Sequence, residues 1–145
     1  MRLVAGALPV FALLAALGCA GSIFDFSGKE DALEEAQSRY TELVRWGELV
    51  GASAYVDPAI SADFLANAER FRNIRFTDFE SGPLQFGEDS ETATVNVVYH
   101  AYSTRTLVEK QFREHQVWYR EESAGNDWRV RPNLAAIVSE LGGSR

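Results

Sequence analysis

Apolar residues recur with a helical period in two segments of the first half of the chain. Over residues 28–50 they lie three or four positions apart, which predicts an amphipathic helix with one buried stripe. Ser27 and Glu30 fit the capping-box pattern at the start of this helix. Asp57 is followed by proline, a pair typical of an N-cap and first helical position, so we expect a second helix over residues 58–70. The stripe of the first helix consists of Leu33, Ala36, Tyr40, Leu43, Val44, Gly47 and Val50.

In the second half of the chain the apolar pattern changes to the alternation of strands. Runs rich in β-branched and aromatic residues over residues 74–79, 93–104 and 108–121, with a shorter run at 127–131, predict strands. Polar turns separate these runs, so we expect antiparallel strands joined by hairpins. The sequence NLAAIVSEL, residues 133–141, is expected to form a short helix or a capping segment.

The last hairpin predicts which side chains of the sheet share a face. A turn over residues 123–126 that sets Glu122 opposite Asp127 also sets Tyr119 opposite Val130. We therefore expect Tyr119 and its alternate neighbours to point toward the concave side of the sheet. The expected set is Val117, Tyr119, Trp128, Val130, Val95, Val97, Tyr99, Arg113 and His115.

The longest apolar run of the chain stands at its N-terminus. Residues 3–17 carry no charge, follow Arg2 and lead into small residues around Cys19, which is the three-part pattern of a secretory signal. The run is shorter than the roughly 18 to 20 apolar residues with which an α-helix crosses a bilayer core. It therefore predicts export of the chain and not a membrane span.

Cys19 ends the sequence ALGC, residues 16–19, which resembles the lipobox of bacterial lipoproteins with its leucine one place later than usual. The resemblance implies removal of a signal peptide, residues 1–18, lipidation of Cys19 by diacylglycerol and an acyl chain such as palmitate, and a lipidated tether over residues 19–27. Two or three acyl chains hold a protein at a membrane almost permanently, since each buried CH₂ contributes about 0.8 kcal/mol. Ala20 stands where inner-membrane retention would favour aspartate. The expected location is the bacterial cell envelope, at the outer membrane facing the periplasm where two membranes are present.

Two alternatives stay open for this segment. Cleavage after Ala20 would release a soluble periplasmic protein, and an uncleaved segment would act as a signal anchor. The mass of the mature N-terminus distinguishes all three outcomes.

The remaining chain, residues 28–145, has the size and composition of a single α+β domain. Hydrophobic residues make up 46% of the sequence, enough for a packed core and too many for a disordered chain. The formal net charge of -7 disfavours nucleic acid as a partner, because such binding depends on Lys and Arg at the phosphates. The single cysteine excludes an intramolecular disulfide and a multi-thiolate zinc site.

The sequence motifs of several enzyme classes do not occur in the chain. It contains no phosphate-binding loop, no dinucleotide fingerprint, no HExxH zinc motif and no GxSxG nucleophile elbow. The only histidines are His100 and His115. We therefore assign no catalytic residue, no metal and no cofactor from the sequence.

Helices followed by a meander of strands indicate an α+β fold, with N-terminal helices packed on a bent antiparallel sheet. This order resembles the nuclear-transport-factor-two-like superfamily, the cone-shaped, cystatin-like folds that include SnoaL-like and ketosteroid-isomerase-like proteins. The residues that carry the resemblance are the helix DALEEAQSRYTELVRWGEL, the long paired strands and the late Trp128. The resemblance implies a pocket between the helices and the concave face, expected to be lined by Tyr40, Trp46, Tyr55, Tyr99, Arg113 and His115. Alternatively, the aromatic residues belong to the core, and Arg113 and His115 lie at a solvated strand end.

Three functions fit this fold. The leading hypothesis is a lipid-anchored envelope protein that binds a small apolar ligand or a partner protein of the envelope without catalysis. The second is a pocket enzyme, isomerase-like or hydratase-like, acting on a hydrophobic small molecule. It would use His115 as acid or base, Tyr99 as a hydrogen-bond donor and Asp78 as the nearest carboxylate. The third is a structural envelope assembly subunit, a homodimer through an exposed sheet face carrying Phe112 and Trp118.

Overall fold

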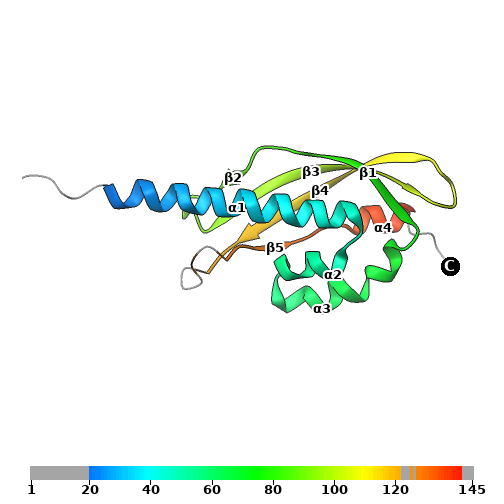
Figure 1. Ribbon diagram of the computed structural model, residues 1–145, viewed down its shortest axis with the longest axis horizontal. Coiled ribbons are helices and arrows are strands. Elements are labelled where there is room, and N and C mark those ends of the chain that lie inside the picture. The colour runs from blue at the N-terminus through cyan, green and yellow to red at the C-terminus, as the bar shows by residue number, and fades with distance from the viewer. Residues whose placement is uncertain (1–19, 122–124, 126, 142–145) are drawn as a thin grey trace, which may run out of the picture.

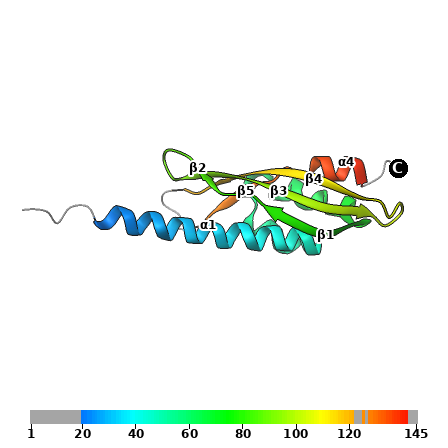
Figure 2. The ribbon, with the colours of Figure 1, turned by 90° about the horizontal axis from the view of Figure 1, so that it is seen from above.

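The protein is a bent antiparallel sheet with helices packed against it, which confirms the α+β fold predicted from the sequence (Figures 1 and 2). The computed structural model describes residues 20–121, 125 and 127–141. The predicted signal peptide, residues 1–18, and Cys19 lie outside the described residues. The helices are α1 (Ala20–Trp46), α2 (Leu49–Ala52), α3 (Pro58–Ala66) and α4 (Ala135–Leu141), with short 3-10 helices η1 (Ser53–Tyr55) and η2 (Ala68–Phe71).

The central strand of the sheet is β3. Strands β1 and β4 pair with its two edges, β5 continues the sheet beyond β4, and β2 also pairs with β3. All of these pairings are antiparallel, as the hairpin pattern predicts. The strands are β1 (Ile74–Ser81), β2 (Gln85–Phe86), β3 (Thr92–Ser103), β4 (Glu109–Tyr119) and β5 (Arg129–Arg131).

The first helix, α1, begins earlier than the sequence pattern predicts. It starts at Ala20 and therefore includes residues 20–27, which the pattern assigns to a tether. The prediction of a capping box at Ser27 is wrong, because that residue lies inside the helix. The N-terminal end of α1 extends beyond the sheet (Figures 1 and 2).

A glycine turn ends α1 before the predicted boundary. Gly47 has a φ of 73°, in the left-handed region that glycine adopts without steric cost. Its amide donates to the carbonyl of Val44 at 3.0 Å, and the amide of Glu48 donates to the carbonyl of Leu43 at 2.8 Å. This pair of bonds is a Schellman cap. The single helix predicted over residues 28–50 is therefore split into α1 and α2.

The start of α3 follows the sequence prediction. The Asp57 carboxylate accepts a hydrogen bond from the amide of Ala59 at 2.9 Å, which is the expected N-cap. The same carboxylate accepts a hydrogen bond from Arg131 Nε at 2.9 Å, so the cap also ties α3 to β5. The predicted helix over residues 58–70 is divided between α3 and η2.

The register of the last hairpin differs by one residue from the prediction. Trp118, and not Tyr119, lies opposite Val130. Because side chains alternate along a strand, a shift of one residue exchanges the two faces of β4. The prediction that Arg113 and His115 point inward is therefore wrong, and both lie on the exposed outer face. The inner face of β3 and β4 includes Val95, Val97, Tyr99, Phe112, Glu114, Gln116 and Trp118.

Helix α1 covers this inner face. Leu33, Tyr40 and Val44 have no exposed surface, which confirms that part of the predicted stripe. The rings of Tyr40 and Trp118 meet edge-on, with their centroids 5.8 Å apart. Val50, at the predicted end of the stripe, is instead 77% exposed, because it lies beyond the turn that ends α1.

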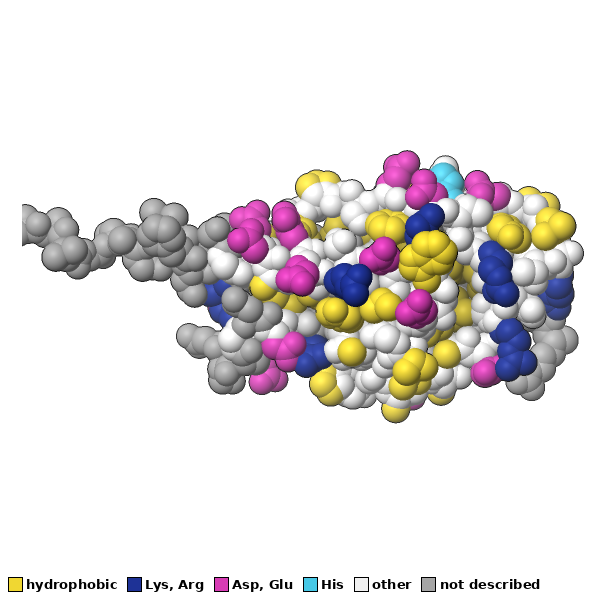
Figure 3. Space-filling view, in the orientation of Figure 1, with side chains coloured by type: hydrophobic (Ala, Val, Ile, Leu, Met, Phe, Trp, Pro, Cys, Tyr) yellow, Lys and Arg dark blue, Asp and Glu magenta, His cyan; other side chains and the backbone are white. Residues whose placement is uncertain are grey.

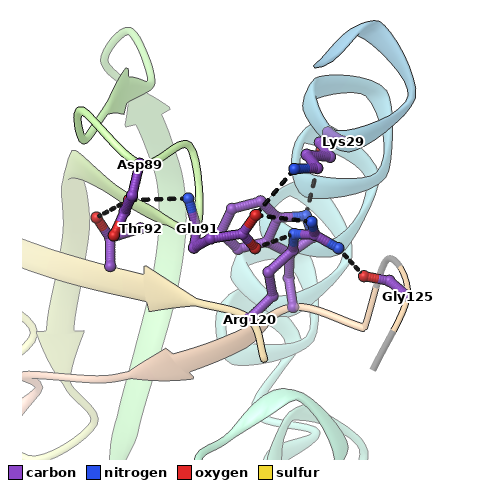
Figure 4. A network of polar contacts seen from close by, with 7 residues as sticks. Lys29, Asp89, Glu91, Thr92, Arg120 and Gly125 are labelled. Carbon is purple, nitrogen blue, oxygen red and sulfur yellow. Dashed lines mark hydrogen bonds and ion pairs between the residues drawn. The ribbon is translucent and has the colours of Figure 1, made fainter. Parts of the chain in front are cut away.

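An ion cluster at Glu91 fastens α1 to the sheet (Figure 4). Glu91 lies just before β3 and meets Lys29 Nζ of α1 at 2.8 Å and Arg120 Nε, just after β4, at 2.6 Å. Arg120 also donates to the carbonyl of Gly125, and Trp128 Nε1 donates to the carbonyl of Lys29 at 3.2 Å. We call Lys29, Glu91 and Arg120 the Glu91 clamp. It holds three separate segments of the chain together.

We expect Glu91→Gln to destabilise the fold, because it removes the charge that the two cations of the clamp share. The hydrogen bond from Lys29, followed by the one from Arg120, holds the pKa of Glu91 below its ordinary value of 4.5. The stability that the clamp contributes is therefore complete well above that pH and is lost as the pH falls through the lowered pKa. Urea unfolding at about pH 7 and about pH 3 measures the difference, which should be large at the higher pH and small at the lower. The matched control is Glu88→Gln, an exposed acid of the same turn, and equal midpoints for the two variants at the higher pH would contradict the clamp's role.

Candidate functional site

A carboxyl group lies at the centre of the packed interior. Glu114 of β4 has no exposed surface. Its Oε1 accepts hydrogen bonds from the Tyr40 hydroxyl at 3.3 Å and from the Asn133 amide at 3.2 Å. Its Oε2 accepts from the Tyr99 hydroxyl at 3.0 Å and from Gln116 Nε2 at 2.9 Å. The carboxyl therefore joins α1, β3, β4 and the segment before α4.

The hydrogen bonds continue from Glu114 along the inner face. Gln116 Oε1 accepts from the Trp118 indole at 3.0 Å, and Gln116 Nε2 also donates to the Thr41 hydroxyl at 3.3 Å. Gln37 of α1 donates to the hydroxyls of Thr41 at 3.0 Å and Ser81 at 3.1 Å. Buried polar groups of this kind stabilise a structure only where their partners are present. We call the connected set the Glu114 network, which consists of Gln37, Tyr40, Thr41, Ser81, Tyr99, Glu114, Gln116, Trp118 and Asn133.

Burial controls the protonation of this network. It raises the pKa of Glu114 above its ordinary value, while the hydrogen bonds from Gln116, Tyr99, Asn133 and Tyr40 oppose that shift. All four of these partners are uncharged donors. Burial, together with the nearby Glu114 charge, also raises the pKa values of Tyr40 and Tyr99. Both phenols therefore remain protonated at neutral pH and can donate.

A pocket lies between α3, η2 and α4. Its cavity volume is about 360 Å³. Phe71, Leu134 and Val138 are buried and form its apolar floor, and Ile60 and Phe64 of α3 are half-buried beside them. Three polar side chains also line the pocket, and because they are exposed we place them at its rim: Asp63, Asn67 and Arg70. We call this cavity the α3–α4 pocket.

One segment of backbone connects the pocket to the Glu114 network. Pro132 and Leu134 line the pocket, and Asn133 between them donates its amide hydrogen to Glu114. The carboxyl therefore lies behind the pocket wall, and it does not form part of the pocket surface. A ligand in the pocket would press on the segment that completes the carboxyl's hydrogen bonds.

Two of the six predicted pocket residues come together. Tyr40 and Tyr99 both donate to Glu114, but neither has exposed surface, so they line the packed interior and not an open cavity. Trp46 is 63% exposed at the end of α1, where the chain turns away from the sheet. Tyr55 of η1 is half-buried beside Trp128, away from the network.

The other two predicted residues, Arg113 and His115, lie on the outer face of β4 and are exposed. His115 Nδ1 lies 3.2 Å from the Asn96 side chain on that face. His115 therefore cannot work beside Tyr99 as acid or base, since the two side chains lie on opposite faces of the sheet. Asp78 is exposed as well, so it is not the carboxylate of the interior.

The predicted homodimer surface also needs correction. Phe112 and Trp118 are 5% and 0% exposed and belong to the inner face. The one-residue register shift that turns Arg113 outward turns these two aromatic residues inward. A sheet-face homodimer would therefore have to use the outer face.

Glu114 and Gln116 are the site residues that the sequence prediction missed. They share strand parity with Phe112 and Trp118, which are large apolar residues of the same run. Two aromatic residues at the even positions are a sequence signal for the inner face, and they outweigh Val117 and Tyr119 at the odd positions. Glu114 lies between Phe112 and Trp118 on the same face of the strand, and this pattern would have identified Glu114 as a buried carboxyl.

Neither a metal centre nor a membrane-spanning helix is found in the part of the chain that the structure describes. Within residues 20–121, 125 and 127–141, no group of three or more His, Cys, Asp or Glu side chains could hold a metal ion. Within the same residues, no helix is both long enough and apolar enough to cross a bilayer.

Comparison with known proteins adds information on the fold alone. No family model and no curated protein matches the sequence. A solved structure from Mycobacterium tuberculosis, of unknown function, is similar with a TM-score of 0.52 and 13% identity over 84% of this chain and 82% of that chain. Another, from Silicibacter sp. and assigned only provisionally as a polyketide cyclase, has a TM-score of 0.47 and 10% identity over 76% of this chain and 95% of that chain. The first similarity agrees with the α+β fold described above, a bent antiparallel sheet with helices packed against it.

The buried carboxyl predicts an unusual pH dependence of stability. A carboxyl whose pKa is raised by folding costs stability as the pH rises from its unfolded value, ordinarily 4.5, to its folded value. The cost is about 1.4 kcal/mol for each unit by which the pKa is raised. We expect Glu114→Gln to remove this decline, so that wild-type protein loses stability relative to the variant as the pH rises above about 5 toward the alkaline range.

Urea unfolding of both proteins across this range measures the effect. Glu121→Gln, an exposed acid just beyond β4, is the matched control and should leave the wild-type profile unchanged. Parallel pH profiles for wild type and Glu114→Gln would show that Glu114 keeps its ordinary pKa.

Proposed function

We propose that this protein is a lipid-anchored cell-envelope protein that binds a small apolar ligand in the α3–α4 pocket without transforming it. The observation that carries the proposal is the pocket itself. Small-molecule sites are typically apolar cavities of about 300 to 1,000 Å³ with a few polar groups that orient the ligand. The α3–α4 pocket, at about 360 Å³, fits the lower end of this range.

The lining of the pocket indicates the kind of ligand that would bind. Phe71, Leu134 and Val138 offer apolar surface, whose burial contributes about 25 cal/mol for each Å² removed from water. Asp63, near Asn67 and Arg70, places charged and hydrogen-bonding groups at the rim. A compact apolar molecule with one hydroxyl or amide end would satisfy both parts.

Acid/base catalysis fits the same fold less well. Glu114 has the raised pKa that a proton-transferring carboxyl needs. A general acid or base must, however, lie within hydrogen-bond reach of the substrate, directly or through one water. Glu114 has no exposed surface, and its two oxygens are each occupied by two donors from the protein. The pocket is accessible but the carboxyl of Glu114 is not, so we favour ligand binding over catalysis.

The lipid anchor is supported by the sequence around Cys19. The apolar run, the ALGC sequence and the absence of any other cysteine all agree with lipidation at this residue. α1 begins at Ala20, and its N-terminal end extends past the sheet (Figure 1). A lipid attached to the chain before this end would leave the ligand pocket at a distance from the bilayer.

A variant that fills the pocket tests the binding proposal. Ala135 is exposed and lines the α3–α4 pocket, so Ala135→Phe should place a ring in the cavity without disturbing the core. Its neighbour Ala136 is equally exposed and does not line the pocket, which makes Ala136→Phe the matched control. With the neutral apolar fluorophore N-phenyl-1-naphthylamine as probe, we expect the first variant to bind at least about tenfold more weakly than wild type, a loss of about 1.4 kcal/mol. The second should bind as wild type does, and equal affinities for the two variants would refute the pocket assignment.

The anchor has a separate test that does not depend on ligand binding. Expressed with its signal in a bacterium, the wild-type protein should begin at Cys19 with a diacylglycerol thioether and should partition into detergent. Cys19→Ser should leave the protein in the aqueous phase, because no thiol is then present to carry the lipid. Mass spectrometry of the N-terminus reads the result directly. An unmodified chain that begins at Gly21 would rule out the lipoprotein assignment.

A further inference from the structure

A second cleft lies between the end of α1 and the start of β1. Its cavity volume is about 530 Å³. The described residues that line it include three arginines, Arg45, Arg72 and Arg75, and no acidic residue. Figure 3 shows several Lys and Arg side chains near the end of the molecule away from the N-terminal end of α1, while many Asp and Glu side chains lie elsewhere. We call this cavity the arginine cleft.

The rest of the cleft is apolar. Leu49, Phe71 and Ile74 are buried at its floor. Trp46 is 63% exposed and Val50 is 77% exposed, and both belong to its wall. An exposed tryptophan beside an apolar floor is surface that water solvates poorly.

Arg45 is held in place before any ligand arrives. Its guanidinium lies 4.9 Å from the centre of the Trp46 ring, and its Nη2 donates to the carbonyl of Thr77 at 3.0 Å. Its Nε is buried and has no hydrogen-bond partner among the described residues. A fixed side chain loses little conformational entropy when a ligand binds.

Arg75 and Arg72 are positioned by the backbone and by a neighbouring acid. Arg75 Nη1 donates to the carbonyls of Arg72 and Ile74, each at 2.9 Å, which holds its guanidinium at the start of β1. Arg72 pairs with Glu69, three positions earlier on the exposed surface. Among the described residues that line the cleft, three therefore carry guanidinium groups and none carries a carboxylate, in a protein whose net charge is -7. An anion placed among them would relieve this local excess of positive charge.

We propose that the arginine cleft binds a small organic anion that combines a carboxylate with a flat apolar body. Guanidinium groups match the geometry of a carboxylate, and the exposed Trp46 ring together with the apolar floor matches a planar hydrophobic skeleton. Phe71 lines both this cleft and the α3–α4 pocket, so the two cavities lie on either side of it. The proposal does not rest on ligand binding in that pocket.

The three tryptophans of the chain provide a direct readout. Trp118 and Trp128 are 0% and 1% exposed, and their indole N–H groups donate inside the protein, whereas Trp46 is open to the cleft. With 2-naphthoate as the probe, we expect a saturable shift of the Trp46 indole N–H signal in a ¹H–¹⁵N spectrum. The signals of Trp118 and Trp128 should stay in place. The variant Trp46→Phe assigns the signal by removing it.

Charge selectivity tests the arginines. We expect 2-naphthoate to bind at least about tenfold more tightly than the neutral 2-naphthamide, a difference of about 1.4 kcal/mol. Arg45→Gln should remove most of this preference, and Arg75→Gln provides a second variant should the first fail to fold. Arg39→Gln, an exposed arginine of α1 outside the cleft, is the matched control. Equal affinity for the acid and the amide, or an equal loss in the control variant, would overturn the proposal.

Two further measurements distinguish the arginine cleft from the α3–α4 pocket and from a lipid-binding surface. Ala135→Phe should leave the binding of 2-naphthoate unchanged, since that residue lines only the α3–α4 pocket. Arginine-dependent binding to phosphatidylglycerol vesicles without any response to 2-naphthoate would replace the proposal with a lipid-surface site.

Discussion

The structure depends on satisfying one carboxyl group that has no contact with solvent. Four donors surround Glu114, and a buried polar group without hydrogen-bond partners costs several kcal/mol. Those donors come from α1, β3, β4 and the segment before α4. The position of each of these elements is therefore coupled to the others by hydrogen bonds with defined directions, in addition to apolar packing, which has none.

The filled interior determines where ligands can bind. Tyr40, Tyr99 and Trp118 occupy the space between α1 and the inner face of the sheet, and none of them has exposed surface. Two accessible cavities lie instead beside η2, where Phe71 borders both the α3–α4 pocket and the arginine cleft. The two cavities differ in chemistry, because one is apolar with a polar rim and the other combines apolar surface with three guanidinium groups. The short, irregular connection between α3 and β1 therefore contributes residues to both cavities.

The sequence predicted which elements occur better than how they face one another. The Asp57 cap, the meander of strands and the stripe through Leu33, Tyr40 and Val44 depend on local chemistry, and all three are present. Alternation along β4 shows that odd and even residues lie on opposite faces, but it does not show which of the two sets points inward. That choice depends on the register of the hairpin. The prediction set Glu122 opposite Asp127 across the turn, and this register, one residue away from the observed one, placed Arg113 and His115 on the inner face. The interior carboxyl could have been identified only by giving Phe112 and Trp118 more weight than the turn.

The uninterrupted helix α1 has a mechanical consequence. Its 27 residues span roughly 40 Å at about 1.5 Å per residue, and the Glu91 clamp fixes it to the sheet near Lys29. A helix fixed at this point is a rigid extension of the domain, whereas a flexible linker would allow the domain to reorient freely. If the chain were attached to a surface at the start of α1, the rigid helix would determine both the distance of the domain from that surface and the direction in which the domain faces. Because the Glu91 clamp fixes α1 to the sheet, the orientation of α1 would also determine where the two cavities face.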